Sequence, residues 1–328
     1  MKKVYVLAAN EALATGVTGP MDMFNLANTL WHKQQRNQFD PLFDIQLAGL
    51  DKNPIKISGG LDVVPAIAID EIEQADLLFI AAHNFTVKSA LKAYCQSIAS
   101  KAESIKRLHA DGCRIAAYCS GTFALAGLGM LDDKKATTSW WFKDYFHSTY
   151  PKVEIDMSRL VVEQDGVWTA GATTSYLDLC LNLIEQLAGQ EISNMLSKIM
   201  LQDTQKRSQL PFLAIPESID HGDSVIAESQ QWIQKHYHQN FNLDLLADNV
   251  AMSKRNYIRR FKKAVGETPN VYLQRIRVEA AKRYLETSEL TLQKIVERVG
   301  YDDVSAFRKV FQKITSLTPK SYRLRFAR

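Results

Sequence analysis

The stretch RIAAYCSGTFALAGLGML, residues 114–131, decides the fold of the first half of the chain. Its apolar start predicts a buried strand that ends at Tyr118, and its small residues after Gly121 predict a helix. Cys119 and Ser120 stand at the sharp turn between the two. In a strand, elbow and helix of this kind, the side chain at the turn is exposed above the sheet, and the N–H groups that follow can hold an anion.

Apolar runs on both sides of this stretch predict a parallel β-sheet whose strands alternate with helices. The predicted strands are KKVYVLAA (2–9), FDIQLAGL (43–50), ADLLFIAA (75–82) and GCRIAAYC (112–119). Apolar residues three and four positions apart predict crossover helices over 21–35 and 88–112. The expected fold of this region is therefore an α/β sandwich.

A hairpin and a capped helix mark the end of the α/β region. Asp165-Gly166 separates two β-rich runs within 158–172, and the helix that follows should end at Gly189. We therefore expect a first domain over 1–190. The polar, proline-punctuated segment 191–224 is interpreted as a helix and a linker.

Length and charge indicate two domains with different partners. A chain of 328 residues suggests about two domains, and 46% hydrophobic against 23% charged residues is typical of a folded globular protein. Residues 1–221 carry 20 Lys+Arg and 25 Asp+Glu, whereas residues 222–328 carry 20 and 11. The resulting charges of −5 and +9 predict that the C-terminal third meets a polyanion.

Cysteine usage and hydropathy indicate the compartment. The four cysteines show neither CxxC pairs nor zinc-ligand spacing, which predicts reduced thiols, no metal site and no cofactor. The longest apolar run, 123–131, is shorter than the roughly 18 residues that span a bilayer. We therefore expect a cytoplasmic protein without a membrane anchor.

Residues 225–328 show only helical spacing, which predicts an all-α second domain. Within 242–266, a short apolar helix is followed by a break at Ala251-Met252 and by a second helix that Ser253 caps. Such a pair, with a cationic outward face on its second helix, matches the geometry that places a helix in the major groove of DNA.

The same pattern recurs over 290–319, with a turn at Gly300–Asp303. Ser305 stands 52 residues after Ser253, and between the two patterns 269–288 predicts one long helix. A helix of about 17 residues is about 25 Å long, so it can hold two recognition helices about one DNA turn apart.

These residues resemble the AraC family of transcription regulators over about 226–328. The resemblance rests on Ala251-Met252-Ser253-x-Arg255, Arg259-x-Phe261-Lys262, Gly266-x-x-Pro269, Tyr272-Leu273-x-x-Ile276-Arg277, Ala280-Ala281-x-x-Tyr284-Leu285, Val299-Gly300-Tyr301, Phe307, Phe311 and Thr318-Pro319-x-x-Tyr322-Arg323. Ser316 departs from it, because the family usually has glycine there. The resemblance implies a double-stranded operator DNA as partner.

The outward faces of the two recognition helices carry the candidate DNA contacts. Arg255 and Arg259 are the main candidates for base reading, because an arginine forks onto guanine O6 and N7. Ile258 and Ala306 are candidates for contact with thymine methyl groups. The phosphate and remaining surface candidates are Ser253, Lys254, Lys262, Lys263, Arg275, Ser305, Arg308 and Lys309, each of which is alternatively a solvated surface residue.

The first domain resembles the class I glutamine amidotransferase-like superfamily, whose fold is a flavodoxin-like parallel-sheet sandwich. The closest resemblance is to the PfpI-like sensor domain that precedes AraC modules in GlxA-type regulators. It rests on Gly19-Pro20-x-x-x-Phe24-x-x-Ala27-Asn28, Cys119-x-Gly121-x-Phe123-x-Leu125-Ala126, Ala136-Thr137-Thr138-x-Trp140 and Asp178-Leu179-Cys180-Leu181. The resemblance implies a homodimer that responds to a small effector, such as an amino acid or a betaine.

Enzymes of this superfamily pair the elbow cysteine with a histidine, and no histidine stands at a matching position here. Ser120 follows Cys119 directly, and no carboxylate occurs near Gly16. His83 or His147 could approach in three dimensions. We therefore assign no catalytic residue, with a cysteine hydrolase or amidase fused to a DNA-binding module as the alternative.

Ends of the predicted strands and the loops after them define a candidate ligand pocket, because ligands of open α/β sheets lie there. Its candidate residues are Asn10, Val17, His83, Asn84, Cys119, Ser120, Trp140 and Thr173, with ordinary packing as the alternative for each. Trp140-Trp141 can surround a cationic ligand with ring faces. The sequence thus predicts a ligand-responsive DNA-binding regulator. A third interpretation is an architectural DNA-binding protein whose α/β domain only dimerises and binds no ligand.

Overall fold

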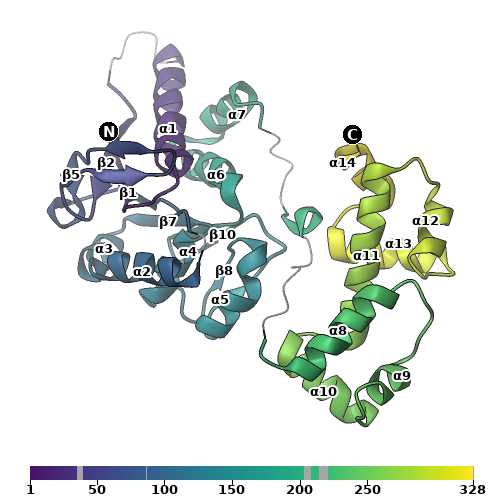
Figure 1. The fold of residues 1–328 in the computed structure, drawn as a ribbon. Helices are drawn as coiled ribbons and strands as arrows, with labels where there is room; N and C mark the ends of the chain where they lie inside the picture. The colour runs from purple at the N-terminus through teal and green to yellow at the C-terminus, as the bar shows by residue number, and fades with distance from the viewer. Residues whose placement is uncertain (35–39, 86, 203–207, 214–220, 328) are drawn as a thin grey trace. The chain divides into compact units, whose positions relative to one another are not determined.

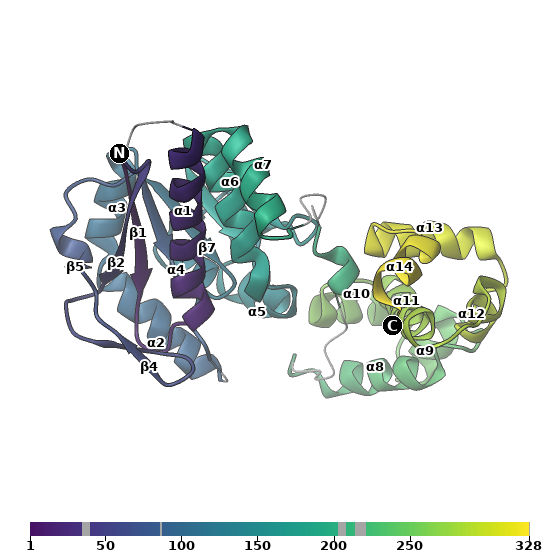
Figure 2. The same cartoon turned by 90° about the horizontal axis from the view of Figure 1, so that it is seen from above.

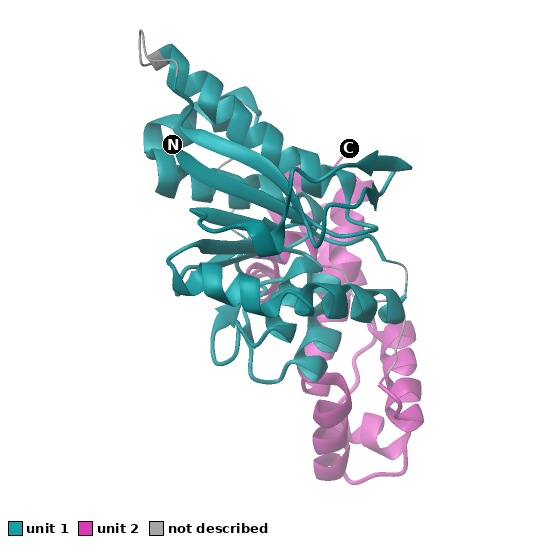
Figure 3. Cartoon of the chain, turned by 90° about the vertical axis from the view of Figure 1, so that its left-hand side faces the viewer, with its two compact units in different colours: residues 1–209 teal, residues 210–328 magenta. Residues whose placement is uncertain are grey.

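The computed structural model describes residues 1–34, 40–85, 87–202, 208–213 and 221–327. Contacts divide the chain into two compact units, residues 1–209 and residues 210–328 (Figure 3). Each unit has its own apolar cores.

Eleven strands and seven α-helices are described in unit 1. The strands are β1 (Lys2–Ala8), β2 (Phe43–Gly49), β3 (Ile55–Ile57), β4 (Leu61–Val63), β5 (Ile67–Ala68), β6 (Leu77–Ile80), β7 (Arg114–Tyr118), β8 (Lys135–Ala136), β9 (Glu154–Ile155), β10 (Val161–Gln164) and β11 (Val167–Ala170). The helices are α1 (Ala14–Gln34), α2 (Lys88–Ala99), α3 (Ala102–Ala110), α4 (Gly121–Gly127), α5 (Lys143–Thr149), α6 (Tyr176–Ala188) and α7 (Gln190–Ile199).

Seven of the strands form the central sheet, in the order β10-β11-β7-β6-β1-β2-β5. Every neighbouring pair in it is parallel except the β10–β11 hairpin at the edge. The predicted hairpin is confirmed, since Asp165 and Gly166 both have positive φ, 52° and 75°, at its turn. The strand order reverses between β1 and β6, and ligands of open α/β sheets lie at such a point.

Side chains of the inner strands alternate between the two faces of the sheet. Val4 and Val6 of β1 pack with α1, α6 and α7, whereas Tyr5 and Leu7 pack with α2, α3, α4 and α5. These two sets of helices cover opposite faces of the sheet (Figures 1 and 2). Because both faces are covered, these strands are apolar throughout, as their sequences predicted. The expected three-layer α/β fold is confirmed.

Some elements differ from the expected ones. The helical pattern over 88–112 forms two helices, α2 and α3, which are interrupted at Ser100 and Lys101. The short strands β3, β4, β5, β8 and β9 were not predicted, because two or three residues are too few to show a periodicity. The helix expected to end at Gly189 does so, with Gly189 at φ 90°.

The described part of unit 2 is all-α beyond residue 223, as predicted. Its α-helices are α8 (Ser224–His236), α9 (Leu243–Asp248), α10 (Lys254–Val265), α11 (Pro269–Thr287), α12 (Leu292–Arg298), α13 (Val304–Thr315) and α14 (Pro319–Phe326). Helix α11 runs between two clusters of helices (Figure 1). Tyr272 and Ile276 pack with α8, α9 and α10, whereas Ala281 and Leu285 pack with α12, α13 and α14. The predicted spacer is therefore the shared core element of both clusters.

Candidate DNA interface and elbow site

The first helix-turn-helix unit is built from α9, a tight turn and α10. Asn242 caps α9 by accepting a hydrogen bond from the N–H of Leu245 (2.9 Å), and Ala251 adopts φ 50° in the turn. Ser253 caps α10 by accepting from the N–H of Asn256 (3.4 Å), as predicted. Local side-chain bonds therefore fix where the second helix begins.

Helix α10 separates a buried aromatic face from an exposed basic one. Tyr257 and Phe261 are fully buried, and the Tyr257 hydroxyl lies 2.7 Å from the Ser229 hydroxyl of α8. The helix carries six basic side chains and no acidic one. Its exposed candidates are Lys254, Arg255, Arg259, Lys262 and Lys263, with Ser253 exposed just before it and Ile258 half-buried.

Three basic residues near this face are held by protein partners. Lys254 forms an exposed ion pair with Asp244 (3.0 Å). Arg260 forms a two-pronged ion pair with Asp223, which also caps α8, at 2.8 and 3.0 Å. Arg275 is half-buried and pairs with Glu267 at 2.7 Å. The arginine expected to bind phosphate from α11 is therefore already engaged by a carboxylate.

The second unit repeats the first with a spacing of 50 residues. The buried pair Phe307 and Phe311 of α13 follows the pair Tyr257 and Phe261 by 50 residues, not by the 52 that separate the two serines. Asp303, not Ser305, caps α13, because its carboxylate accepts from the Ser305 N–H at 2.7 Å. Five residues separate the two helices in each unit, 249–253 in the first and 299–303 in the second, so Asp303 occupies the position that Ser253 has in the first unit. Ser305, Ala306, Arg308 and Lys309 are all exposed.

Arg277 of α11 links the two helical clusters. Its guanidinium donates to the carbonyl oxygens of Tyr237 (2.8 Å) and Gln239 (2.9 Å) after α8, and it lies over the Tyr301 ring in the second turn (5.2 Å). A Cβ on Gly300 would stand 2.9 Å from this guanidinium, so the turn approaches it closely. The sequence analysis included Arg277 in a family motif but did not predict that it links the two clusters.

The elbow of unit 1 is present, but its cysteine is buried. Cys119 adopts φ 52° at the end of β7, a strained conformation for a residue with a Cβ. Its side chain is only 5% exposed, so the expectation of an exposed side chain above the sheet is wrong. The loop after β8 contributes to this closure, since the Thr138 hydroxyl donates to the Cys119 carbonyl oxygen at 2.7 Å.

The groups around the elbow are hydroxyls rather than bases. Burial raises the pKa of the Cys119 thiol, and hydrogen bonds with Ser139 and Ser120 oppose that rise. Ser120 is fully buried, and its hydroxyl accepts from the His83 N–H (2.8 Å) and donates to the His83 carbonyl oxygen (3.1 Å). A neutral, buried thiol is a weak nucleophile.

His83, whose backbone is hydrogen-bonded to the Ser120 hydroxyl at the elbow, is a poor base. The centroid of its imidazole ring lies 4.9 Å from that of the Tyr94 ring, and its Nδ1 is buried with no hydrogen-bond partner in the described part of the chain. Burial lowers the pKa of His83, while the carboxylate of Glu11 partly offsets that effect. His147 is exposed on α5.

The remaining pocket candidates are only partly brought together. Asn10 and Asn84 are exposed, and their loops meet where the Asn84 N–H donates to the Glu11 carbonyl oxygen at 2.7 Å. Val17 is buried in a small apolar cluster. Trp140 is half-buried, edge-on to Trp141 with ring centroids 5.3 Å apart, and Thr173 is exposed where a short 3-10 turn begins.

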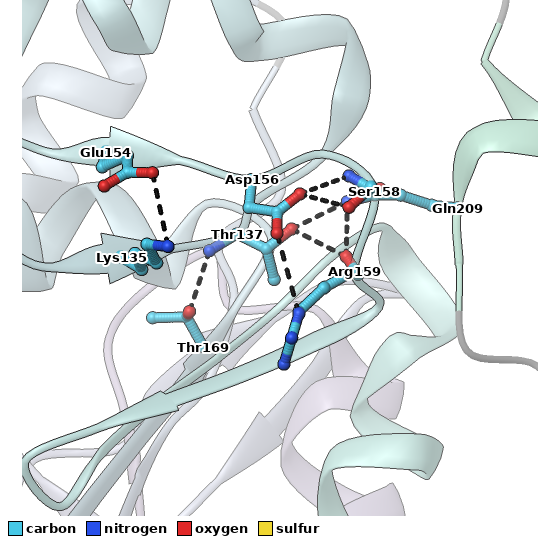
Figure 4. Close-up of polar contacts among 8 residues, drawn as sticks. All are labelled: Lys135, Thr137, Glu154, Asp156, Ser158, Arg159, Thr169 and Gln209. Carbon is cyan, nitrogen blue, oxygen red and sulfur yellow. Dashed lines mark hydrogen bonds and ion pairs between the residues drawn. The ribbon is translucent and has the colours of Figure 1, made fainter. Parts of the chain in front are cut away.

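Sequence reasoning missed a buried glutamine beside this loop. Gln209 is 2% exposed, and its amide nitrogen donates to the Thr137 hydroxyl (2.8 Å) and the Arg159 carbonyl oxygen (3.3 Å) (Figure 4). It also donates to the Thr138 carbonyl oxygen (3.1 Å). It lies in the segment interpreted as a linker. No local pattern indicates its burial, because its partners precede it by 50 to 72 residues.

Comparison with known proteins agrees with both units. The DJ-1/PfpI family model matches residues 2–186, and a helix-turn-helix domain model matches residues 246–325. The HTH-type transcriptional regulator CdhR of Pseudomonas aeruginosa is 23% identical over 287 residues, covering 87% of this chain and 80% of CdhR. The regulator GbdR of the same species is 20% identical over 307 residues, covering 92% of this chain and 81% of GbdR.

A solved structure supports the fold of unit 1. Drosophila melanogaster DJ-1beta superposes with a TM-score of 0.51 and 18% identity, covering 62% of this chain and 98% of that one. Across the described residues, no helix is long and apolar enough to cross a membrane.

A DJ-1/PfpI-like α/β unit followed by two helix-turn-helix units defines a DNA-binding transcription regulator. The chain belongs to the DJ-1/PfpI family, and its C-terminal region is of the AraC type.

Proposed function

We propose that this protein is a ligand-responsive, sequence-specific regulator that grips two successive major grooves of its operator. The observation that carries the proposal is the shared α11 helix, which packs in both apolar clusters, each of which holds one capped recognition helix. In this proposal residues 225–328 bind DNA and residues 1–190 bind the effector and form a cytoplasmic homodimer. The segment 191–224 connects the two.

Base reading is proposed for Arg255 and Arg259 of α10 and for the exposed face of α13. Both arginines are exposed, and neither is ion-paired to a carboxylate among the described residues. The experiment begins with selection of bound duplexes from a random library by the full chain. Competition binding then compares the selected duplex with a scrambled one at fixed salt, because salt alone changes the affinity of every phosphate contact. Recovery of no shared motif would support an architectural binder instead.

The effector is proposed to be a small nitrogen compound that binds near the loops of Asn84 and Trp140. The regulators CdhR and GbdR match unit 1 as well as unit 2, which supports a common architecture. A melting-temperature screen of amino acids, amines and betaines tests the proposal, since a ligand at 100 times its Kd adds about 2.7 kcal/mol of stability. Coupling to DNA is reciprocal, so the ligand Kd must change when operator is bound.

The alternative of a cysteine hydrolase rests on the strained backbone of Cys119. Its neutral thiol opposes that alternative, because the thiolate is the nucleophile. Iodoacetamide at pH 7 should modify Cys119 no faster than a cysteine in an unfolded peptide. Fast modification, together with loss of an amidase activity in Cys119→Ala, would establish the enzyme.

A further inference from the structure

The amide nitrogen of Gln209 occupies a site that is better suited to a different nitrogen group. Three oxygen atoms accept from it, the Thr137 hydroxyl and the carbonyls of Thr138 and Arg159, and we call these three the acceptor cage. A carboxamide nitrogen has two hydrogens, whereas a primary ammonium has three. The cage therefore has one more acceptor than the glutamine amide has N–H donors.

The other end of the same amide is unsatisfied. The Gln209 carbonyl oxygen, Oε1, is buried and has no hydrogen-bond partner among the residues that the structure describes. Leaving a buried acceptor unpaired costs about 1–3 kcal/mol, so the glutamine is a strained occupant. A ligand that brings only donors into the cage avoids this cost.

The cage is held in shape by bonds that do not involve Gln209. The Thr137 hydroxyl donates to the Arg159 carbonyl oxygen (3.0 Å), and the Thr137 N–H donates to the Thr169 hydroxyl (2.9 Å). The Asp156 carboxylate accepts from the Ser158 N–H at 2.8 Å and so fixes the loop that presents Arg159 (Figure 4). The Asp156 carboxylate also forms an ion pair with the Arg159 side chain at 3.7 Å, which ties the two ends of this short loop together (Figure 4).

The cage and the elbow are parts of one structure. The Thr138 hydroxyl donates to the Cys119 carbonyl oxygen, and the Cys119 N–H donates to the Gly171 carbonyl oxygen at 3.0 Å. A Cβ added at Gly171 would stand 2.7 Å from Gln209 Oε1. Gly171 therefore joins the elbow directly to the Gln209 side chain.

We propose that the acceptor cage binds the primary ammonium group of the effector, and that Gln209 is the resident occupant that this group displaces. The inference rests on the proposed sensing function and narrows its ligand class, because a trimethylated nitrogen has no N–H to donate. Gln209 is the last residue of unit 1, and unit 2 begins at Leu210. Just beyond, the Leu213 carbonyl oxygen accepts from Lys282 of α11. Displacement of Gln209 thus releases the point at which the connection leaves the sensor.

The first experiment observes Gln209 itself in the full chain labelled with [15N]glutamine. The side-chain amide signal that disappears in Gln209→Ala identifies it. Titration with n-butylammonium should move this signal to the position of a solvent-exposed amide, whereas tetramethylammonium at the same concentration should leave it unchanged. Equal responses to the two cations, or no movement of the signal while n-butylammonium binds, would overturn the proposal.

The second experiment uses matched variants and the Kd of n-butylammonium. Gln209→Ala should tighten binding roughly tenfold, because no occupant remains to be displaced. Gly171→Ala should also tighten binding roughly tenfold, because its added Cβ would crowd the Gln209 side chain without altering a cage oxygen. Thr137→Val should weaken binding roughly tenfold, whereas Thr137→Ser, which keeps the hydroxyl, should bind as the parent does. Unchanged affinity in Gln209→Ala would exclude competition for the cage.

These measurements use no DNA, so they separate the cage from the regulatory function. Amine binding with the expected variant pattern, but with operator affinity independent of amine, would retain the cage and reject the regulatory coupling. Operator binding that responds to a ligand while Gln209 and Thr137 variants behave as the parent would retain the regulator and reject the cage.

Discussion

The two helix-turn-helix units have the same core and different surfaces. Each recognition helix buries two aromatic rings at positions four apart, and each is capped by a side chain at its first turn. Helix α10 carries six basic residues, whereas α13 carries three, and the α10 cap is the neutral Ser253 where the α13 cap is the anionic Asp303. Buried rings and caps thus define the unit, while the outward face varies. We expect α10 to supply most of the affinity for DNA.

The largest expected effect concerns Arg277, which links the two helix-turn-helix units within unit 2. Arg277→Ala removes two charge-assisted hydrogen bonds and leaves the carbonyl oxygens of Tyr237 and Gln239 without this donor. We expect unit 2 to lose about 3 kcal/mol of unfolding free energy, measured by urea denaturation of the full chain. Arg283→Ala, an exposed position on the same helix, is the control. Similar losses of unfolding free energy in the two variants would show that Arg277 does not join the two helix-turn-helix units.

The next effect tests the difference in surface directly. Arg259→Ala should weaken binding to the selected operator about tenfold more than binding to a scrambled duplex, because a bidentate arginine–guanine contact discriminates by about 1–3 kcal/mol. Lys309→Ala on α13 should cost less and should affect both duplexes alike, as a phosphate contact does. Gel-shift titrations at one salt concentration give both values. Equal losses on both duplexes in Arg259→Ala would assign that arginine to phosphate.

A smaller effect concerns the ends of the two recognition helices. Both end in the left-handed region, at Gly266 (φ 82°) and at Ser316 (φ 58°). Only glycine adopts this conformation without a steric cost, so Ser316→Gly should stabilise unit 2 by about 1 kcal/mol. Gly266→Ser should destabilise it by a similar amount. No described atom lies within 4 Å of the added Cβ, so the cost comes only from placing a residue with a side chain in the left-handed backbone conformation. Thermal unfolding of the full chain measures both changes.

The sequence predicted the parts of this molecule that depend on local patterns. The strand and helix around Cys119 and the aromatic pair of α10 are decided by periodicity and caps, which neighbouring residues determine. The same reasoning measured the repeat from Ser253 to Ser305 as 52 residues, whereas the caps of the two recognition helices, Ser253 and Asp303, are 50 residues apart. Counting from the buried rings, rather than from the serines, would have identified Asp303.

The elbow region of unit 1 was harder to predict because distant segments complete it. The loop that closes over Cys119 is held by the hydrogen bond from the Thr138 hydroxyl, and the burial of Gln209 depends on residues at least 50 positions earlier. A polar side chain in a linker has no sequence signature that distinguishes a docked amide from a solvated one. The eight pocket candidates therefore contained the elbow and omitted the acceptor cage.

The smallest effect exchanges the caps of the two units. Asp and Ser are similarly good caps, so Asp303→Ser and Ser253→Asp should each change the unfolding free energy by less than about 0.5 kcal/mol. The exchange nevertheless moves one negative charge between surfaces that we expect to face phosphates. Asp303→Ser should raise affinity for a scrambled duplex two- to threefold, roughly, and Ser253→Asp should lower it by at least as much, with both effects reduced at high salt. An effect of Ser253→Asp without any of Asp303→Ser would mean that only the first unit approaches the DNA backbone, and a single-groove mode of binding would then replace the two-groove one.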